Sequence, residues 1–344
     1  MNNLGIIGGG QLGMFICKAA KRLGIKTSIF SEIEDFSAKK FCDQYFIGKF
    51  NDLEILENFI RSADVFTIET ENIPFDFLNI ISKTKKIFPE PKIVKICQNR
   101  LKEKVFLNSL KNIKTAKFYP INNFKDLEKN IGLVNNNGIL KTSELGYDGK
   151  GQYKINDGKI EEFKKLNLKN FILEEVLDFR KEISVIVCRG SKKSISYPVV
   201  ENIHKNAILR ETIYPAELND KVSKKATQIA IQIANEINLN GILAVEMFLM
   251  KNETILINEL APRPHNSGHW TMDYCKISQF HNLINTIFFK TPKHPIPSGS
   301  CKMVNVIGDD FLKKNQLEEK FKFYNYFKKE IKSNRKMGHY IIKI

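Results

Sequence analysis

Cysteine pairs and long apolar runs are both missing from this sequence. The six cysteines are far apart and include no C-x-x-C pair, so neither a disulfide framework nor a paired-cysteine metal or redox site is expected. No apolar run reaches the roughly 18 residues that a membrane span requires, and no secretory leader precedes Leu4. We therefore expect a cytoplasmic globular protein with reduced thiols and no membrane insertion.

Nucleic-acid-binding motifs are also missing, although the chain is basic. It has 54 Lys+Arg against 38 Asp+Glu, a formal net charge of +16, and the lysines are scattered over every segment. A scattered excess is typical of a generally positive surface, which favours encounter with small anionic substrates. We expect no nucleic-acid partner. A length of 344 residues predicts two or three domains.

The amino-terminal region has the pattern of a Rossmann-like α/β domain. Residues 4–7 form an apolar run, residues 8–13 read G-x-G-x-x-G, and an amphipathic helix is expected through about Leu23. A second strand over residues 27–30 ends at the acidic Glu32, as in dinucleotide-binding proteins. The turn has three readings: it binds NAD(P), it binds a phosphate-bearing substrate, or it is purely architectural.

A second candidate site segment follows the predicted strand of residues 64–68. It reads Glu69-Thr-Glu71-Asn-Ile-Pro74 and places two acids at the carboxyl end of the strand. Open α/β sheets bind their ligands at this edge. The alternative is an ordinary polar turn.

Pro89 and Pro91 mark a domain boundary, after which a lysine-rich helix is expected. Within that helix, Arg100 and Lys104 are typical of an exposed face. Farther on, residues 138–142 read as a strand with Lys141 facing inward, followed by the glycine-rich segment 146–152. Such a loop can fold over a polyphosphate although it is not a Walker A loop, or it is an ordinary hairpin tip.

A hairpin is predicted from residues 241–250 and 254–260, with its turn near 251–252. Simple alternation sets Glu246 opposite about Ile257 and puts residues 246, 257 and 259 on one face. Two carboxylates there, with Asn258 alongside, suit Mg²⁺. Residues 258–271 then bring an arginine and two histidines, Arg263, His265 and His269, onto an irregular loop. The alternative is a solvated edge hairpin.

Other segments read as scaffold. Residues 220–237 carry one apolar stripe of a core helix, and residues 274–289 predict another helix. A proline-rich linker over 291–297 leads to a β-rich tail that contains the basic pair Arg335 and Lys336. The predicted domains are a Rossmann-like domain (1–90), a central domain (91–290, with a smaller lobe at about 112–177) and a small carboxyl-terminal domain (291–344).

Taken in order, seven segments resemble the N5-carboxyaminoimidazole ribonucleotide synthetase family of ATP-grasp enzymes, the ATPase subunit of phosphoribosylaminoimidazole carboxylase. They are residues 8–13, 69–74, 98–104, 146–152, 174–176, 258–271 and 335–339. The resemblance implies an α/β ATP-grasp fold and a carbon–nitrogen ligase of purine biosynthesis. It implies that bicarbonate and ATP form carboxyphosphate, which carboxylates 5-aminoimidazole ribonucleotide.

The resemblance also assigns residues. It implies ATP contacts from Arg100, Lys141, Gly146, Tyr147, Asp148, Gly149, Lys150, Gly151, Gln152, Glu174, Glu175, Val176, Leu177, Glu182, His204, Asn258 and Glu259. Substrate contacts would be Gly10, Gln11, Leu12, Glu71, Arg263, His265, Asn266, Ser267, Arg335 and Lys336, and catalytic groups Tyr147, Arg263, His265 and Glu71. Glu246 and Glu259 match the ligands of Mg²⁺, or of Mn²⁺ in its place.

Some roles stay open at this stage. Either His265 or Glu71 would accept the proton of the substrate amine. The segment 142–145 departs from the family pattern, with Glu144 where basic character is expected. A homodimer and a functional link to the mutase that uses the product are expected by analogy. The rival functions are another ATP-grasp ligase that forms an acyl phosphate, and an NAD(P)-dependent oxidoreductase.

Overall fold

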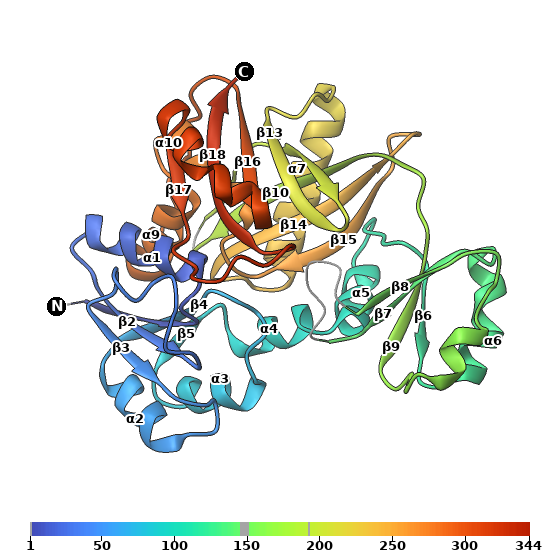
Figure 1. Cartoon of the computed structure of the whole chain (residues 1–344), viewed down its shortest axis with the longest axis horizontal. Helices are drawn as coiled ribbons and strands as arrows, with labels where there is room; N and C mark the ends of the chain where they lie inside the picture. Colours follow the sequence, from blue (N-terminus) through green and yellow to red (C-terminus); the bar gives the residue numbers. More distant parts are fainter. Residues whose placement is uncertain (1, 145–150, 192) are drawn as a thin grey trace.

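Three β-sheets organise the chain in the computed structural model, which describes residues 2–144, 151–191 and 193–344 (Figure 1). The first is a parallel sheet of order β3-β2-β1-β4-β5. Its strands are β1 (Asn3–Ile7), β2 (Lys26–Ser31), β3 (Gln44–Ile47), β4 (Val65–Ile68) and β5 (Lys86–Phe88). Helices α1 (Gln11–Arg22), α2 (Leu53–Arg61) and α3 (Phe75–Ser82) connect them.

The strand order reverses between β1 and β4, as it does at the switch point of a doubly wound sheet. The glycine turn after β1 and the acidic segment after β4 therefore lie side by side at one edge of the sheet. Helices α4 (Pro91–Cys97) and α5 (Arg100–Ser109) then lead out of this domain. They are separate helices because Asn99 caps the second one, its side chain accepting from the Lys102 N–H at 3.0 Å.

The second sheet is a small antiparallel one of order β6-β9-β7-β8. It contains β6 (Phe118–Ile121), β7 (Gly138–Thr142), β8 (Gln152–Ile155) and β9 (Phe171–Glu175), with α6 (Phe124–Ile131) packed on it. Its own apolar cluster, which includes Leu127 and Leu140, makes it a separate lobe.

The third sheet spans the centre and the carboxyl-terminal region. Its path is β15-β14-β10-β12-β13-β16-β18-β17, with β11 paired to β10. The strands are β10 (Phe179–Arg189), β11 (Ser194–Ser196), β12 (Val200–Lys205), β13 (Ile208–Tyr214), β14 (Gly241–Met250), β15 (Ile255–Ala261), β16 (Cys301–Ile307), β17 (Phe323–Asn325) and β18 (Lys336–Lys343). The β-rich tail thus extends the central sheet instead of forming one of its own. The three-domain division stays a prediction.

Helices α7 (Asp220–Glu236) and α9 (Gln279–Phe289) cover this sheet. The stripe of Val222, Ala226, Ile229 and Ile233 is buried as predicted. The helix expected to start at residue 274 was placed too early, because α9 begins at Gln279. Residues 275–278 instead hydrogen-bond the proline-rich segment, for example from the Lys276 N–H to the Ile296 carbonyl at 3.1 Å. Short elements α8 (Thr271–Tyr274) and α10 (Lys314–Lys320) complete the chain.

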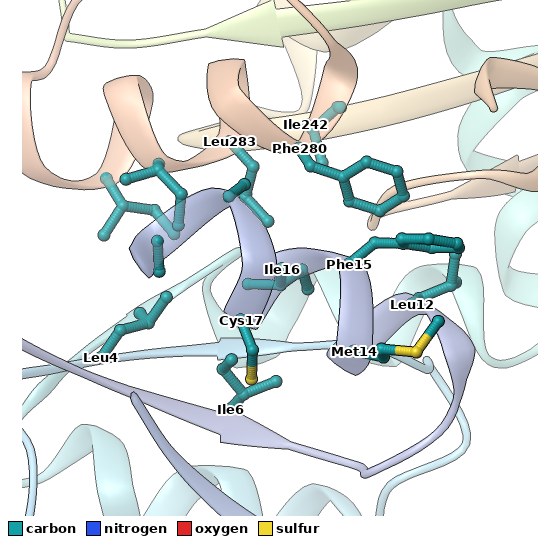
Figure 2. Close-up of a cluster of buried hydrophobic side chains, with 14 of the residues drawn as sticks. Leu4, Ile6, Leu12, Met14, Phe15, Ile16, Cys17, Ile242, Phe280 and Leu283 are labelled. Atoms are coloured by element: carbon teal, nitrogen blue, oxygen red, sulfur yellow. The ribbon is translucent and has the colours of Figure 1, made fainter. Parts of the chain in front are cut away.

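The first domain packs on the central sheet through α1 and α9. Figure 2 shows Phe15 and Ile16 of α1 facing Phe280 and Leu283 of α9, with Ile242 of β14 behind them. All are buried, and a fully buried side chain of this size contributes about 1.5–3 kcal/mol. This contact fixes the glycine turn at the start of α1 relative to β14 and β15.

All six cysteines are free, as predicted. Among the described residues, no helix has the length and apolar character of a membrane span.

Candidate functional site

A cleft of about 600 Å³ lies where the three sheets meet. The first domain contributes residues 10–12 and 69–72, the small sheet contributes Lys141 and Gln152, and the central sheet contributes β14, β15 and the loop beyond them. Polar and charged side chains dominate its wall. A cleft of this size can take a nucleotide and a second small substrate.

The β14–β15 hairpin places two acids in this cleft. Glu246 pairs directly with Glu259, while the next pair along is Met247 with Ile257. The prediction that Glu246 lies opposite Ile257 was therefore wrong by two residues. The register of the Leu249–Ile255 pair differs from the predicted one by one residue, and a β-bulge at Asn258 adds another. Ile257 points into the core and Glu259 into the cleft, so the prediction that they share a face was also wrong.

The pair is electrostatically crowded. Burial, reinforced by the nearby Glu259 carboxylate, raises the pKa of Glu246 to about 7. Burial and Glu259 also raise the pKa of Glu103 to about 8, although Glu103 accepts a hydrogen bond from the Leu260 N–H at 2.9 Å. Like charges that disfavour each other in this way would be relieved by a cation.

Two arginines flank these acids. Arg100 Nη1 lies 3.3 Å from Glu259 Oε2, and the Arg263 guanidinium holds Glu71 through two contacts, one of them 2.9 Å from Nη2 to Oε1. Burial alone would raise the pKa of Glu71, but Arg263 outweighs it and lowers that pKa. Glu71 is therefore a paired carboxylate with its proton affinity reduced.

Lys141 is buried at 7% exposure and lies 3.0 Å from Glu174 Oε2, where Lys104 also approaches to 3.4 Å. The expectation that Lys104 lies on an exposed helix face was wrong, since only 2% of it is exposed. The facing acid comes from β9, a strand some seventy residues later. Glu174 itself does not line the cleft.

Glu182 and His204 face each other from β10 and β12 and both line the cleft. Burial alone would lower the pKa of His204, but the hydrogen bond to Glu182 raises it.

The glycine turn holds an anion that belongs to the chain itself. Glu69 accepts hydrogen bonds from the Gly10 and Gly13 N–H groups, the latter at 2.8 Å. Burial raises the pKa of this carboxyl. A Cβ on Gly10 would lie 2.6 Å from Glu69 Oε1. Glu69 thus lies where a dinucleotide would place its phosphate, which argues against the NAD(P) reading.

His265 and Asn266 line the cleft next to Glu246, with His265 Nε2 3.1 Å from Glu246 Oε1. Burial and the Arg263 charge hold the pKa of His265 well below its usual range. Lys336 lines the cleft from β18, whereas Arg335 donates to the Glu330 carbonyl at 3.1 Å and does not line it.

Most of the predicted site residues meet in this cleft. Those that line it are Gly10, Gln11, Leu12, Glu71, Arg100, Lys141, Gln152, Glu182, His204, Glu246, Asn258, Glu259, Arg263, His265, Asn266 and Lys336. Those that do not are Gly151, Glu174, Glu175, Val176, Leu177, Ser267 and Arg335. Gly146, Tyr147, Asp148, Gly149 and Lys150 lie outside the described residues.

Three further polar residues, Glu69, Gln98 and Glu103, line the cleft, and the Gln98 amide donates to the carbonyls of Glu71 and Ile73. In the sequence, Glu69 lies in a candidate segment, but no individual role was assigned to any of the three. The signal for Glu69 was present in its position at the end of β4. The sequence contains no signal for Glu103, because its partner is a backbone N–H of the bulged strand. Glu144, the departure from the family pattern, accepts from Asn99 Nδ2 at 2.8 Å.

Within the described residues, no group of three or more His, Cys, Asp or Glu side chains is arranged to hold a metal ion. A cation here would need further ligands from a bound substrate.

Three family descriptions match the chain in sequence. They are a ribonucleotide synthetase preATP-grasp domain over residues 1–98, an ATP-grasp domain over 106–280, and a phosphoribosylaminoimidazole carboxylase carboxyl-terminal domain over 301–342. The N5-carboxyaminoimidazole ribonucleotide synthase of Bacillus subtilis is 36% identical over 98% of this chain and 90% of the relative. A bifunctional purine synthesis protein of Dictyostelium discoideum is 37% identical, and the chain spans only 36% of its length.

Solved structures agree with this pattern. An N5-carboxyaminoimidazole ribonucleotide synthetase in complex with ADP has a TM-score of 0.95 at 36% identity, covering 100% of this chain and 92% of its own. The N5-carboxyaminoimidazole synthase of Aspergillus clavatus, in complex with ADP and 5-aminoimidazole ribonucleotide, has a TM-score of 0.92 at 26% identity, covering 100% and 94%.

Proposed function

Because the chain belongs to the N5-carboxyaminoimidazole ribonucleotide synthetase family of ATP-grasp ligases, we propose how its cleft divides the work of that reaction. The chain is an ATP-dependent carbon–nitrogen ligase of purine biosynthesis. The proposal covers which residues hold each reactant and the metal. It also covers the reaction of bicarbonate through carboxyphosphate. The direct pairing of Glu246 with Glu259 carries the proposal.

ATP is proposed to lie between the small sheet and the β14–β15 hairpin. Lys141 and Arg100 provide positive charge on the two sides of that space. Glu174 and the connector of Glu175, Val176 and Leu177 would border the nucleotide, and the glycine-rich segment 146–152 would cover its phosphates. Transfer of the γ-phosphoryl group then depends on positioning and on charge stabilisation by these cations.

The residues present fit a divalent cation. Glu246 and Glu259 offer hard carboxylate oxygens from adjacent strands. Burial and the Glu259 carboxylate raise the pKa of Glu246, and a bound cation would oppose this by stabilising the charged form. Mg²⁺, or Mn²⁺, would be held by these two acids together with ATP phosphate oxygens. When bound, it would offset the negative charge of the phosphates. About 39% of the Glu259 side chain is exposed, so it can reach a substrate from its strand.

Bicarbonate and carboxyphosphate are proposed to bind at Arg263 and His265. The Arg263 guanidinium has partners in Glu71 and the Pro264 carbonyl, and it faces the cleft next to His265. In this arrangement Arg263 would stabilise the carbonate-derived oxygens, and Tyr147 would help to exclude water from the short-lived intermediate.

The ribonucleotide is proposed to bind at the opposite wall, between the turn of Gly10, Gln11 and Leu12 and the side chain of Lys336. Asn266 lies beside them, while Ser267 and Arg335 would act from outside the cleft wall. Glu71 would orient the aminoimidazole. Carboxyphosphate would break down to CO₂ and inorganic phosphate next to Arg263. The exocyclic amine would then attack the CO₂ carbon and lose one proton as the nitrogen–carbon bond forms.

Measurement of ADP release tests the proposal. We expect release to depend on bicarbonate and to rise when 5-aminoimidazole ribonucleotide is added. ADP release that does not depend on bicarbonate but rises with another carboxylate substrate would favour a different ATP-grasp ligase. Quenching of NAD(P)H fluorescence by the protein would favour an oxidoreductase.

We also propose a homodimer in the cytoplasm, with a functional link to the mutase that uses the product. The fused bifunctional relative supports such a link, and the free thiols support a reducing compartment. Sedimentation of the purified protein would test the dimer.

A further inference from the structure

A chain of buried polar side chains runs across neighbouring strands of the central sheet toward the cleft. Thr212 Oγ1 lies 3.1 Å from Asn202 Oδ1, Asn202 Nδ2 lies 2.9 Å from Ser184 Oγ, and Ser184 Oγ lies 2.9 Å from Ser267 Oγ. Ser267 Oγ lies 2.9 Å from Nδ1 of His265. Every member is at least nine-tenths buried, so solvent cannot replace these hydrogen bonds.

The direction of the chain is fixed by a donor that cannot rotate. The backbone N–H of Ser267 donates to His265 Nδ1 at 3.3 Å, as the cap of the short helix Asn266–Gly268. A ring nitrogen that accepts this bond carries no proton of its own. His265 therefore holds its proton on Nε2.

The donor and acceptor directions of the remaining hydrogen bonds follow from this tautomer. Since Nδ1 accepts, the Ser267 hydroxyl donates to it, and Ser267 Oγ is left to accept from Ser184. Ser184 then accepts from the Asn202 amide, and Asn202 Oδ1 accepts from Thr212. Each serine hydroxyl thus accepts one hydrogen bond and donates one, and Nδ1 accepts from both the N–H and the hydroxyl of Ser267. Such aligned chains strengthen each bond in a buried site.

Two further contacts hold the backbone of His265 in place. Gln279 accepts from the His265 backbone N–H at 2.9 Å and donates to the His265 carbonyl at 2.7 Å. On the cleft side, Nε2 lies 3.1 Å from Glu246 Oε1. The Nε2–H bond is thus directed at Glu246 and at the space beside it.

We propose that the backbone N–H of Ser267 and the chain Thr212–Asn202–Ser184–Ser267 together lock His265 as the Nε2–H tautomer, which makes His265 a hydrogen-bond donor to the cleft. Ser267 and Ser184 are positioning residues, because they act through His265 and do not line the cleft. In this state His265 has no free lone pair on the cleft side with which to accept a proton from an amine. Its role toward a carbonate-derived anion would be donation, a consequence that rests on the proposed function.

The direct test is ¹⁵N NMR of the full-length protein labelled at histidine. The two neutral tautomers differ in their ring nitrogen shifts and couplings, and the chain has only six histidines to assign. The His265→Gln variant identifies the signal of His265. We expect a protonated Nε2 and a bare Nδ1; a protonated Nδ1 would overturn the proposal. This reading does not depend on turnover, so it is separate from the test of function.

Variants of Ser267 extend the test. Ser267→Ala removes the hydroxyl that donates to Nδ1, and we expect kcat to fall about 10-fold or more with little change in the KM for ATP, the usual scale for a partner that orients a site histidine. Ser267→Thr keeps the hydroxyl and should restore part of the loss. Ser28→Ala, at a buried serine of β2, is the matched control and should keep full activity.

Ser267→Ala keeps the backbone N–H that faces Nδ1, so the Nε2–H tautomer should persist in this variant. A folded Ser267→Ala protein with unchanged kcat would contradict the positioning role of the chain. If Ser267→Ala does not fold, Ser184→Ala gives the same comparison one step farther along the chain. A spectrum of wild-type protein decides the tautomer in either case.

Discussion

Glu246 and Glu259 lie directly opposite each other on adjacent antiparallel strands, and both carboxylates face the cleft. Like charges in a cross-strand pair destabilise a hairpin. The pair persists because Arg100 lies at one acid and His265 at the other, and because the raised pKa of Glu246 leaves it partly protonated near neutral pH. The hairpin thus carries an electrostatic cost that a bound cation would remove.

Glu259→Ala should abolish most ADP formation while leaving the fold intact. The change removes half of the carboxylate pair and, with it, a like charge beside Glu246. We expect a fall in kcat of on the order of 100-fold or more, as when one charge-stabilising group is removed from a site. Glu236→Ala, at an exposed acid of α7, should keep full activity. Ordinary turnover by Glu259→Ala at normal Mg²⁺ would refute the metal assignment.

Lys336→Ala should raise the apparent KM for the ribonucleotide far more than the KM for ATP. The lysine faces the cleft from β18, on the wall opposite the small sheet. A remote contact of this kind contributes binding that the ground and transition states share, so kcat should change little. Lys343→Ala, on an exposed lysine of the same strand, is the control. An equal loss for both substrates would count against the proposed site.

Gly10→Ala should impair the enzyme because its new Cβ would lie 2.6 Å from Glu69 Oε1. The turn and the carboxylate would have to separate, which displaces the backbone of Gln11 and Leu12. Gly132→Ala is the matched control, since its Cβ would meet no atom within 4 Å. In a Glu69→Ala background the added cost of Gly10→Ala should shrink. Full additivity of the two changes would show that Glu69 does not shape the turn.

Glu174→Gln should remove a pH-dependent part of the stability. Burial would raise the pKa of Glu174, but Lys141 and Lys104 outweigh it and lower the pKa from 4.5 to about 2. A lowered folded-state pKa stabilises the protein above pH 4.5, and this contribution is lost as the pH falls toward 2. The lowered pKa corresponds to roughly 3 kcal/mol in the free energy of unfolding.

Urea unfolding of wild type and Glu174→Gln between pH 6 and 3 would measure this contribution. The difference in free energy of unfolding should be largest at pH 6 and shrink as the pH falls. Glu162→Gln, at an exposed acid, should show almost no difference. A wild-type advantage that stayed constant over this range would contradict the assignment to the Glu174 carboxylate.

The parts of the fold that the sequence predicted correctly depend on local patterns. The strand–glycine turn–helix of β1 and α1 and the apolar stripe of α7 are set by periodicity and by residues within one turn. The acids Glu246 and Glu259 were found for a similar reason, since each interrupts an apolar run. Their exact cross-strand partners were not predicted, because a bulge depends on how two strands pack against the core.

The unpredicted features depend on contacts between distant segments. Lys104 reads as a solvated helix residue until β9 brings Glu174 beside it. The glycine turn allows a dinucleotide-binding interpretation until β4 brings Glu69 to it. The start of α9 depends on pairing with the proline-rich segment. In each case the deciding partner lies far away in sequence, beyond the reach of a local pattern.

The order of strands in the central sheet has a consequence for synthesis on the ribosome. Strand β16 pairs with β13 on one side and with β18 on the other, and Lys336 enters the cleft from β18. A nascent chain that stops short of β18 leaves the β16 edge uncovered and the cleft without Lys336. We expect such chains to stay inactive and prone to edge-to-edge association until translation has passed β18.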